Sequence, residues 1–391
     1  MIEKIQSVQK FLNEHDIDGW LLYEFDKCNE IARKFLCVQQ LHISRRLFYY
    51  IPRKGEPTLI AHGIESHQFD ALPGKHISYM GWGQMYNELE EMLREANCIC
   101  MEYSPSGAIP YLSKVDAGTV EMVQGCGVSV VSSGFLLGHL TSTLSQEQIQ
   151  LHKTAVSSLQ EIVAGAWDFV GSRIKKGTPV AEGDVRDYIL DEMLRCNLHT
   201  ENNPIVACGP NSAMPHYFPK EKGQVIGSGD FLLIDLWGKC AIDGAIFGDI
   251  TRVGCLGDPT PKQEKVFRLV LEAQQAAISF VEERFSQGEV VKGFEVDEIA
   301  RDVIREGGFE QYFTHRLGHN IGEKLHGHGT HLDSFETLDD RSILTSTCFS
   351  VEPGIYIPGE FGVRLETDVV VDRDGKIEVT GGLQNQIACI I

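Results

Sequence analysis

The sequence contains no uninterrupted stretch of 18 apolar residues, which argues against a transmembrane helix. Its first ten residues also lack the apolar core of a signal peptide. Basic residues are in the minority, with 35 Lys and Arg against 55 Asp and Glu, for a formal charge of -20. A chain of this charge is not expected to bind nucleic acid or an anionic membrane. We therefore expect a cytoplasmic protein with neither kind of partner.

The cysteines show no pattern of a disulfide framework. There are 11 of them, an odd number, and they are scattered along the chain. Cys98 and Cys100 are too close together for a usual structural zinc pair, and no cysteine has the surroundings of a catalytic nucleophile. Free thiols in a reducing compartment explain this usage best. A nucleotide-binding oxidoreductase also lacks support, because no strand is followed by Gly-x-Gly-x-x-Gly.

The length of the chain predicts two domains. Its 391 residues, 42% of them hydrophobic, are too many for one ordinary core. Residues 1–140 alternate short helical and strand patterns, with a hairpin near residues 46–61, and predict a smaller α/β domain. That domain contains no catalytic constellation. Residues 145–391 predict a second domain, which opens with a helix capped by Ser145.

The second domain repeats one order of elements. A long helix over residues 146–170, a shorter helix and a set of strands come first. A long helix over residues 261–285, a shorter one over residues 296–306 and further strands follow. The repeat predicts an α+β domain with an internal duplication about a pseudo-twofold axis.

Four acids stand inside apolar segments of this domain. They form two pairs, Asp235 with Asp249 and Glu352 with Glu366, and the members of each pair are 14 residues apart. Each segment reads as a buried strand that carries one acid. A single acid of this kind is best explained by a salt bridge or by solvent. Four such acids occur at matched spacing, and a His-rich stretch lies between the two pairs. Because a buried carboxylate is costly unless it is paired, this pattern predicts that the acids are ligands for two divalent cations.

Hairpin geometry predicts how the second pair is arranged. The loop Pro358, Gly359 and Glu360 has three residues and contains glycine, as such hairpin loops prefer. Counting outward from Gly359 places Glu352 opposite Glu366. Opposed side chains lie roughly 5 Å apart at Cβ, so two acids there repel each other unless a cation joins them.

The geometry of the first pair is open to two interpretations. A two-residue turn at Asp243 and Gly244 would send Asp235 and Asp249 to opposite faces of the sheet. A wider loop centred near Ile242 would place them directly opposite each other. We predict the second arrangement, because it lets both acids reach one metal site.

These residues resemble the pita-bread metallopeptidase family, which includes methionine aminopeptidase, aminopeptidase P, prolidase and creatinase. The resemblance covers about residues 145–391. Residues 1–140 look like the N-terminal domain of the aminopeptidase P, prolidase and creatinase branch. The resemblance implies a C-terminal pita-bread domain, a creatinase-like N-terminal domain and a homodimer. The matching blocks lie at residues 233–236, 248–252, 315–326, 350–356 and 362–368.

Carried over residue by residue, the resemblance implies two sets of site residues. It also implies two divalent metal ions, for which Mn²⁺ is the first choice and Co²⁺, Zn²⁺ and Fe²⁺ are alternatives. The implied metal ligands are Asp235, Asp249, His319, Glu352 and Glu366. The implied catalytic and site-lining residues are Glu352, His326, His216, His315, Arg364 and Tyr356.

The activity implied by the resemblance is that of an Xaa-Pro aminopeptidase or Xaa-Pro dipeptidase. A metal-bridging hydroxide would attack the carbonyl before proline, with Glu352 as proton shuttle and His326 and His216 near the oxyanion. Two alternatives stay open. One is a creatinase-like C–N hydrolase or lyase acting on a small non-peptide substrate on the same fold. The other is a non-catalytic peptide-binding module.

Several residues depart from the family pattern or have simpler explanations. Trp237 stands where a small residue is usual, Arg316 stands where glycine is common, and the spacing from Asp235 to Asp249 is a few residues longer than usual. These departures put the shape of the substrate pocket in doubt. His326 can share a site with His319 only if the chain bends, which we expect at Gly322. His328 and His331 are expected to be exposed imidazoles in a Gly-rich loop, and Arg364 could be a charge partner of Glu366.

Overall fold

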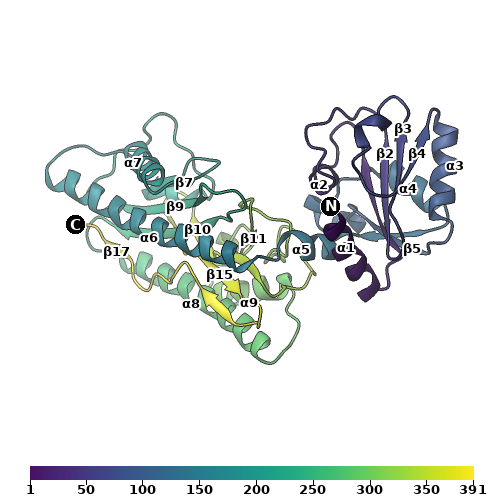
Figure 1. The fold of residues 1–391 in the computed structure, drawn as a ribbon. Helices are drawn as coiled ribbons and strands as arrows, with labels where there is room; N and C mark the ends of the chain where they lie inside the picture. Colours follow the sequence, from purple (N-terminus) through teal and green to yellow (C-terminus); the bar gives the residue numbers. More distant parts are fainter. The chain divides into compact units, whose positions relative to one another are not determined.

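The computed structural model describes residues 1–391, and the chain divides into two units, Met1–Leu140 and Thr141–Ile391. Figure 1 shows helices and strands in both. None of the helices combines the length and apolar character needed to cross a lipid bilayer. The first unit contains α1 (Ile2–Glu14), β1 (Gly19–Glu24), α2 (Glu30–Phe35), β2 (Leu47–Pro52), β3 (Thr58–His62), β4 (Lys75–Tyr79), α3 (Trp82–Leu93), β5 (Cys98–Met101), α4 (Ala117–Gly125), β6 (Ser129–Ser132) and most of α5 (Gly134–Thr141).

The first unit is a mixed six-stranded sheet in the order β4-β3-β2-β1-β5-β6. The predicted hairpin is confirmed as the antiparallel pair β2 and β3. Side chains alternate along β1, so Trp20 packs with α1 and α2, whereas Leu21 packs with α3 and α4 on the other face. Burial on both faces explains why β1 is almost entirely apolar.

The second unit repeats a helix pair and a set of strands, as predicted. Its elements are α6 (Gln146–Lys175), α7 (Glu182–Arg195), β7 (Leu198–His199), β8 (Ile205–Cys208), β9 (Phe231–Cys240), β10 (Gly248–Cys255), α8 (Pro261–Ser286), α9 (Gly293–Glu306), β11 (Asn320–Ile321), β12 (Thr347–Val351), β13 (Gly354–Ile357), β14 (Phe361–Arg364), β15 (Thr367–Val371), β16 (Ile377–Val379) and β17 (Ala388–Cys389).

Both long helices of this unit begin at capping boxes, which fix where they start. Ser145 and Gln148 form the box of α6, as the predicted Ser145 cap requires. Thr260 and Gln263 form the box of α8, which also has Pro261 at its first position. The caps account for the confirmed starts of the two predicted long helices.

The strands of the second unit form two main sheets. One has the order β17-β10-β9-β7 with β8 also paired to β9, and the other has the order β11-β12-β15-β16. A bridge between Thr251 of β10 and Glu366 connects the two sheets. One core packs α6 and α7 against β9 and β10, and another packs α8 and α9 against β12 to β15. The strands therefore lie between the two helix pairs, as Figure 1 shows.

Candidate metal centre

β9 and β10 place the first acidic pair on one face of their sheet. Asp235 lies opposite Thr251, and Asp249 lies opposite Trp237. The two acids are therefore diagonal neighbours, and the prediction that they face each other directly is wrong. The register is centred on Asp243 rather than Ile242, in a loop where the amide of Ala245 donates to the Ile242 carbonyl at 3.1 Å. An even shift of register keeps both acids on the same face.

The hairpin of β13 and β14 arranges the second pair as predicted. Its register is centred on Gly359, whose φ of +76° suits a tight turn. The same register holds further out, where Val351 of β12 lies opposite Thr367 of β15. Glu352 and Glu366 face each other between these two paired stretches. They do not lie inside strands as predicted, because the ladder is interrupted at Pro353, which has no amide hydrogen to donate.

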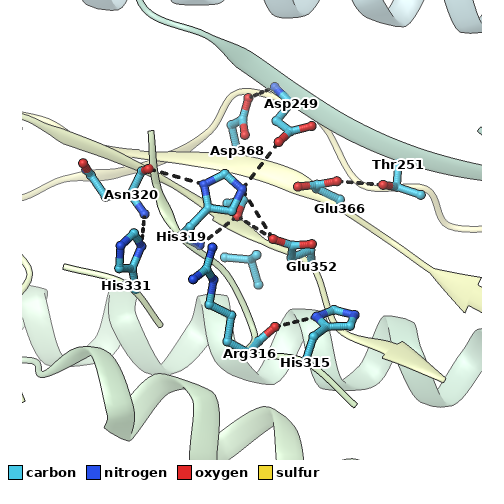
Figure 2. Close-up of polar contacts among 12 residues, drawn as sticks. Asp249, Thr251, His315, Arg316, His319, Asn320, His331, Glu352, Glu366 and Asp368 are labelled. Atoms are coloured by element: carbon cyan, nitrogen blue, oxygen red, sulfur yellow. Dashed lines mark hydrogen bonds and ion pairs between the residues drawn. The ribbon is translucent and has the colours of Figure 1, made fainter. Parts of the chain in front are cut away.

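A third segment brings His319 to the same point. Its backbone amide donates to Ser350 Oγ at 3.0 Å, and its carbonyl accepts from the Ser350 amide at 2.9 Å. Gly318 permits this approach, because a Cβ there would lie 2.0 Å from the Ser350 carbonyl oxygen. Nε2 of His319 lies 3.5 Å from Asp249 Oδ2 and 3.5 Å from Glu352 Oε1, as Figure 2 shows.

The acids and His319 fit a divalent metal. One ligand atom each from Asp249, His319 and Glu366 lies within 4.8 Å of the other two. Oδ1 of Asp235 and Oδ1 of Asp249 are buried and have no hydrogen-bond partner. Buried carboxylate oxygens without partners are costly, and a cation satisfies them. The donor set of carboxylates and one imidazole therefore suits bound divalent cations.

The charges of the site repel one another when no metal is present. Burial and the neighbouring charge of Glu366 hold the pKa of Asp249 well above its usual value. Burial and the charge of Glu352 do the same to the pKa of Glu366. Burial raises the pKa of Glu352 to about 7, against the opposing effect of Arg364. Bound cations would relieve these three shifts together.

Arg364 is the buried positive charge of the site. Its Nη2 donates to Asp235 Oδ2 at 2.5 Å, and its Nε donates to Thr251 Oγ1 at 3.1 Å. Thr251 in turn donates to Glu366 Oε2 at 2.7 Å. The ion-pair partner of Arg364 is therefore Asp235. The charge of Arg364 also opposes the rise in the pKa of Glu366, as expected of a charge partner, although Thr251 stands between the two side chains.

Tyr356 and His315 extend this hydrogen-bonded chain. Nη1 of Arg364 donates to the Tyr356 hydroxyl at 2.9 Å, and that hydroxyl lies 2.7 Å from His315 Nε2. The other ring nitrogen of His315 lies 2.7 Å from the Arg316 carbonyl, to which it donates as N–H. Burial and the charge of Arg364 lower the pKa of His315 to about 3, so its ring is neutral and Nε2 accepts from Tyr356.

His326 and His216 lie on the open side of the centre. The chain turns back after Ile321, as expected near Gly322, and stacks the His326 ring edge-on against His319 with 4.3 Å between centroids. Both His326 and His216 are exposed. Desolvation by the protein packed around the ring, together with the charges of Arg316 and His216, nevertheless lowers the pKa of His326 to about 4.

His331 is buried, contrary to expectation, and His328 is half-buried. Nδ1 of His331 accepts the amide of Asn320 at 3.1 Å, and its own amide donates to Asp339 at 2.8 Å. These contacts make His331 part of the scaffold behind the metal centre (Figure 2). The Gly-rich composition of the loop gave no indication of them.

Sequence reasoning missed Asp368 and Thr251. Asp368 is fully buried, and its Oδ2 accepts the backbone amide of Asp249 at 2.8 Å. Asp368 therefore fixes the backbone of β10 at Asp249, one of the proposed metal ligands. The pattern that could have found it is alternation, because Arg364, Glu366 and Asp368 occupy every second position of one segment.

Known proteins resemble this chain in sequence and structure. It matches the model of metallopeptidase family M24 over residues 155–373. It is 36% identical to the Xaa-Pro dipeptidase of Lactobacillus helveticus over 178 residues, 46% of this chain and 44% of that protein, so the match spans less than half of that relative. It is 35% identical to YkvY of Bacillus subtilis over 86% of this chain and 87% of that protein. The solved Xaa-Pro dipeptidase of Bacillus anthracis matches with a TM-score of 0.64 and 25% identity over 99% of both chains, in agreement with the predicted α+β pita-bread fold.

Proposed function

The chain belongs to metallopeptidase family M24, and from this premise we propose that it is a metal-dependent exopeptidase. Its substrates would be dipeptides or longer peptides with proline second, cleaved at the bond before proline. The observation that carries the proposal is the cluster of Asp249, His319 and Glu366 beside buried carboxylate oxygens that have no hydrogen-bond partner. The Xaa-Pro dipeptidases among the similar proteins support the choice of substrate.

Two divalent cations are the proposed cofactors. An oxygen-rich set with one imidazole suits Mn²⁺, and Co²⁺, Fe²⁺ and Zn²⁺ are alternatives. When bound, they supply Lewis acidity that polarises the scissile carbonyl and makes water a nucleophile near neutral pH. A homodimer, which the family resemblance implies, is also part of the proposal. The residues that would hold the cations are Asp235, Asp249, His319, Glu352 and Glu366.

Glu352 is the proposed proton shuttle. Its side chain is 15% exposed, more than those of Asp235 and Asp249 at 9% and 5%, so it is the more accessible group for water and substrate. Ser350 Oγ donates to its Oε1 at 3.1 Å and fixes the carboxylate. Glu352 would take a proton from the attacking water and pass it to the departing proline nitrogen.

The remaining side chains would bind and orient the substrate. His326 and His216, on the open side, would donate hydrogen bonds to the developing oxyanion. Arg364, held by Tyr356 and Thr251, keeps the Asp235 carboxylate in place. Asp235 would then receive the free amine of the substrate, which restricts cleavage to the N-terminal residue.

Hydrolysis of Xaa-Pro dipeptides tests the function directly. Protein loaded with Mn²⁺ should release proline from an Ala-Pro dipeptide and act far more slowly on Ala-Ala, and it should leave internal peptide bonds intact. Chelator should stop the reaction, and added metal should restore it. Equal turnover of the two dipeptides would remove the proline preference and leave a metallopeptidase. No turnover of either, in protein that has bound metal, would overturn the proposal.

His326→Ala should lose activity and keep its metals. The side chain lies against His319 but outside the proposed ligand set. Losing one oxyanion donor typically costs on the order of 100-fold or more in turnover. Turnover and metal content should be measured on the same preparation, with His328→Ala as the neighbouring control that retains activity. Loss of metal from His326→Ala would show that His326 is a ligand.

A further inference from the structure

The segment of residues 208–224, which leaves the end of β8, lies along the metal centre. The amide of Gly362 in β14 donates to Ser212 Oγ at 2.8 Å, and Nη1 of Arg364 lies 3.4 Å from the Pro215 carbonyl, to which it donates. Arg364 also binds Asp235. His216 follows Pro215 directly, so its position depends on how this segment is held. None of the five proposed metal ligands belongs to the segment.

Exposure alternates where the segment passes the centre. Met214, His216 and Phe218 are exposed, whereas Pro215 and Tyr217 between them are half-buried. Side chains of adjacent residues therefore point in different directions here. An anchor that holds Tyr217 inward also determines where His216 points.

Glu182, at the start of α7, is that anchor. It is fully buried, and each of its carboxylate oxygens accepts two hydrogen bonds. Oε1 accepts from the Cys208 amide at 2.8 Å and Asn211 Nδ2 at 2.9 Å. Oε2 accepts from the Tyr217 hydroxyl at 2.8 Å and the Gln224 amide at 2.7 Å. The four donors come from the beginning, middle and end of the segment, so one carboxylate ties all three together.

Two glycines allow the returning chain to lie directly over this carboxylate. A Cβ on Gly223, whose φ is +68°, would lie 2.3 Å from Glu182 Oε2. A Cβ on Gly183 would lie 2.9 Å from the Cα of Lys222. Just after Gly223 the two stretches of backbone also hydrogen-bond directly, because the Glu182 amide donates to the Gln224 carbonyl at 3.0 Å.

We propose that Glu182 is a positioning residue that holds the 208–224 segment, and with it His216, against the substrate site. The proposal rests on the proposed function for its catalytic consequence. Glu182 touches neither substrate nor metal. Its loss should therefore lower activity mainly through His216 and leave the metals bound.

A double-mutant cycle tests this coupling. In Glu182→Gln, the amide nitrogen replaces an acceptor where four donors meet, so the segment loses part of its anchor. We expect kcat/KM on Ala-Pro to fall on the order of 10- to 100-fold, as for other supports of site residues, with metal content unchanged. In a His216→Ala background the same change should cost little, because the group that it positions is already missing. The matched control Glu161→Gln, an exposed acid on α6, should behave as wild type.

Hydrogen exchange gives a measurement that does not depend on activity. Amides of residues 208–224 should exchange faster in Glu182→Gln, and to a smaller extent in Tyr217→Phe, which removes one donor and serves if the first variant fails to fold. Additive losses in the cycle, loss of metal, or unchanged exchange in both variants would each overturn the proposal. If the wild type cleaves no Xaa-Pro peptide, the proposed function fails, and the exchange measurement still decides whether Glu182 anchors the segment.

Discussion

Glu366→Gln is expected to abolish metal binding and activity while leaving the chelated protein at least as stable as wild type. Burial and the charge of Glu352 raise the pKa of Glu366, so in the absence of metal its ionised form destabilises the fold. Glutamine removes that charge, and its oxygen can still accept the Thr251 hydroxyl now bound at 2.7 Å. The same change removes a ligand oxygen from the cluster with Asp249 and His319. One substitution therefore has opposite effects with and without metal.

Thermal melts of both proteins, with Mn²⁺ and with chelator, measure this difference. They are best run at pH 8, above the pKa of about 7 of Glu352, where that carboxyl group is mostly ionised. Metal at 100 times its Kd should raise the wild-type Tm on the order of 5–10 °C, because binding to the native state adds about 2.7 kcal/mol. Glu366→Gln should lose most of this shift.

The matched control for this experiment is Glu360→Gln. Glu360 lies at the tip of the same hairpin, where it pairs with Lys262 on the surface. Its substitution should leave the metal-induced shift unchanged, since a surface ion pair contributes little to stability. An equal shift in wild type and Glu366→Gln would show that Glu366 is not a ligand.

Local turn chemistry explains why the second acidic pair could be predicted and the first could not. The loop around Gly359 is short, and its glycine marks the turn, so counting outward gave the observed register. The loop between β9 and β10 is longer, and distant parts of the chain help to set its register. Gly248 packs so closely on α6 that a Cβ there would lie 2.5 Å from Val156, and the Asp249 amide is held by Asp368. Neither contact leaves a local mark in the sequence.

The same distinction applies to the other side chains of the site. The sequence predicted that His319 and His326 share one site, because they are only seven residues apart and a single bend between them brings their rings into contact. Both the spacing and the bend can be read from a short stretch of sequence. The pairing of Arg364 with Asp235 joins residues 129 positions apart, and only the assembled sheets bring them into contact. The burial of His331 likewise depends on Asn320 and Asp339, so its loop looked polar and exposed in the sequence.

Arg364→Met should destabilise the chelated protein by about 3–5 kcal/mol, the range for removing one partner of a buried ion pair. Arg364 is 4% exposed and neutralises Asp235 directly, in a site that also holds the charges of Glu352 and Glu366. Methionine fills similar space without charge, so Asp235 loses the guanidinium that pairs with it. Bound Mn²⁺ should restore part of the lost stability because it supplies positive charge at the same place. Urea unfolding of wild type and variant, with metal and with chelator, measures both effects.

Two further variants separate the charge of Arg364 from its hydrogen bonds. Tyr356→Phe removes the hydroxyl that accepts from Arg364 at 2.9 Å but leaves the charge, and should cost only about 1 kcal/mol. Adding Asp235→Asn to Arg364→Met should recover much of the loss in chelator, because the carboxylate left without a partner is then neutral. If the double variant is no more stable than Arg364→Met, the unpaired charge of Asp235 is not the cause, and the loss comes from packing. A recovery in chelator that metal does not increase further is the expected result, since Asp235 is then no longer available as an anionic ligand.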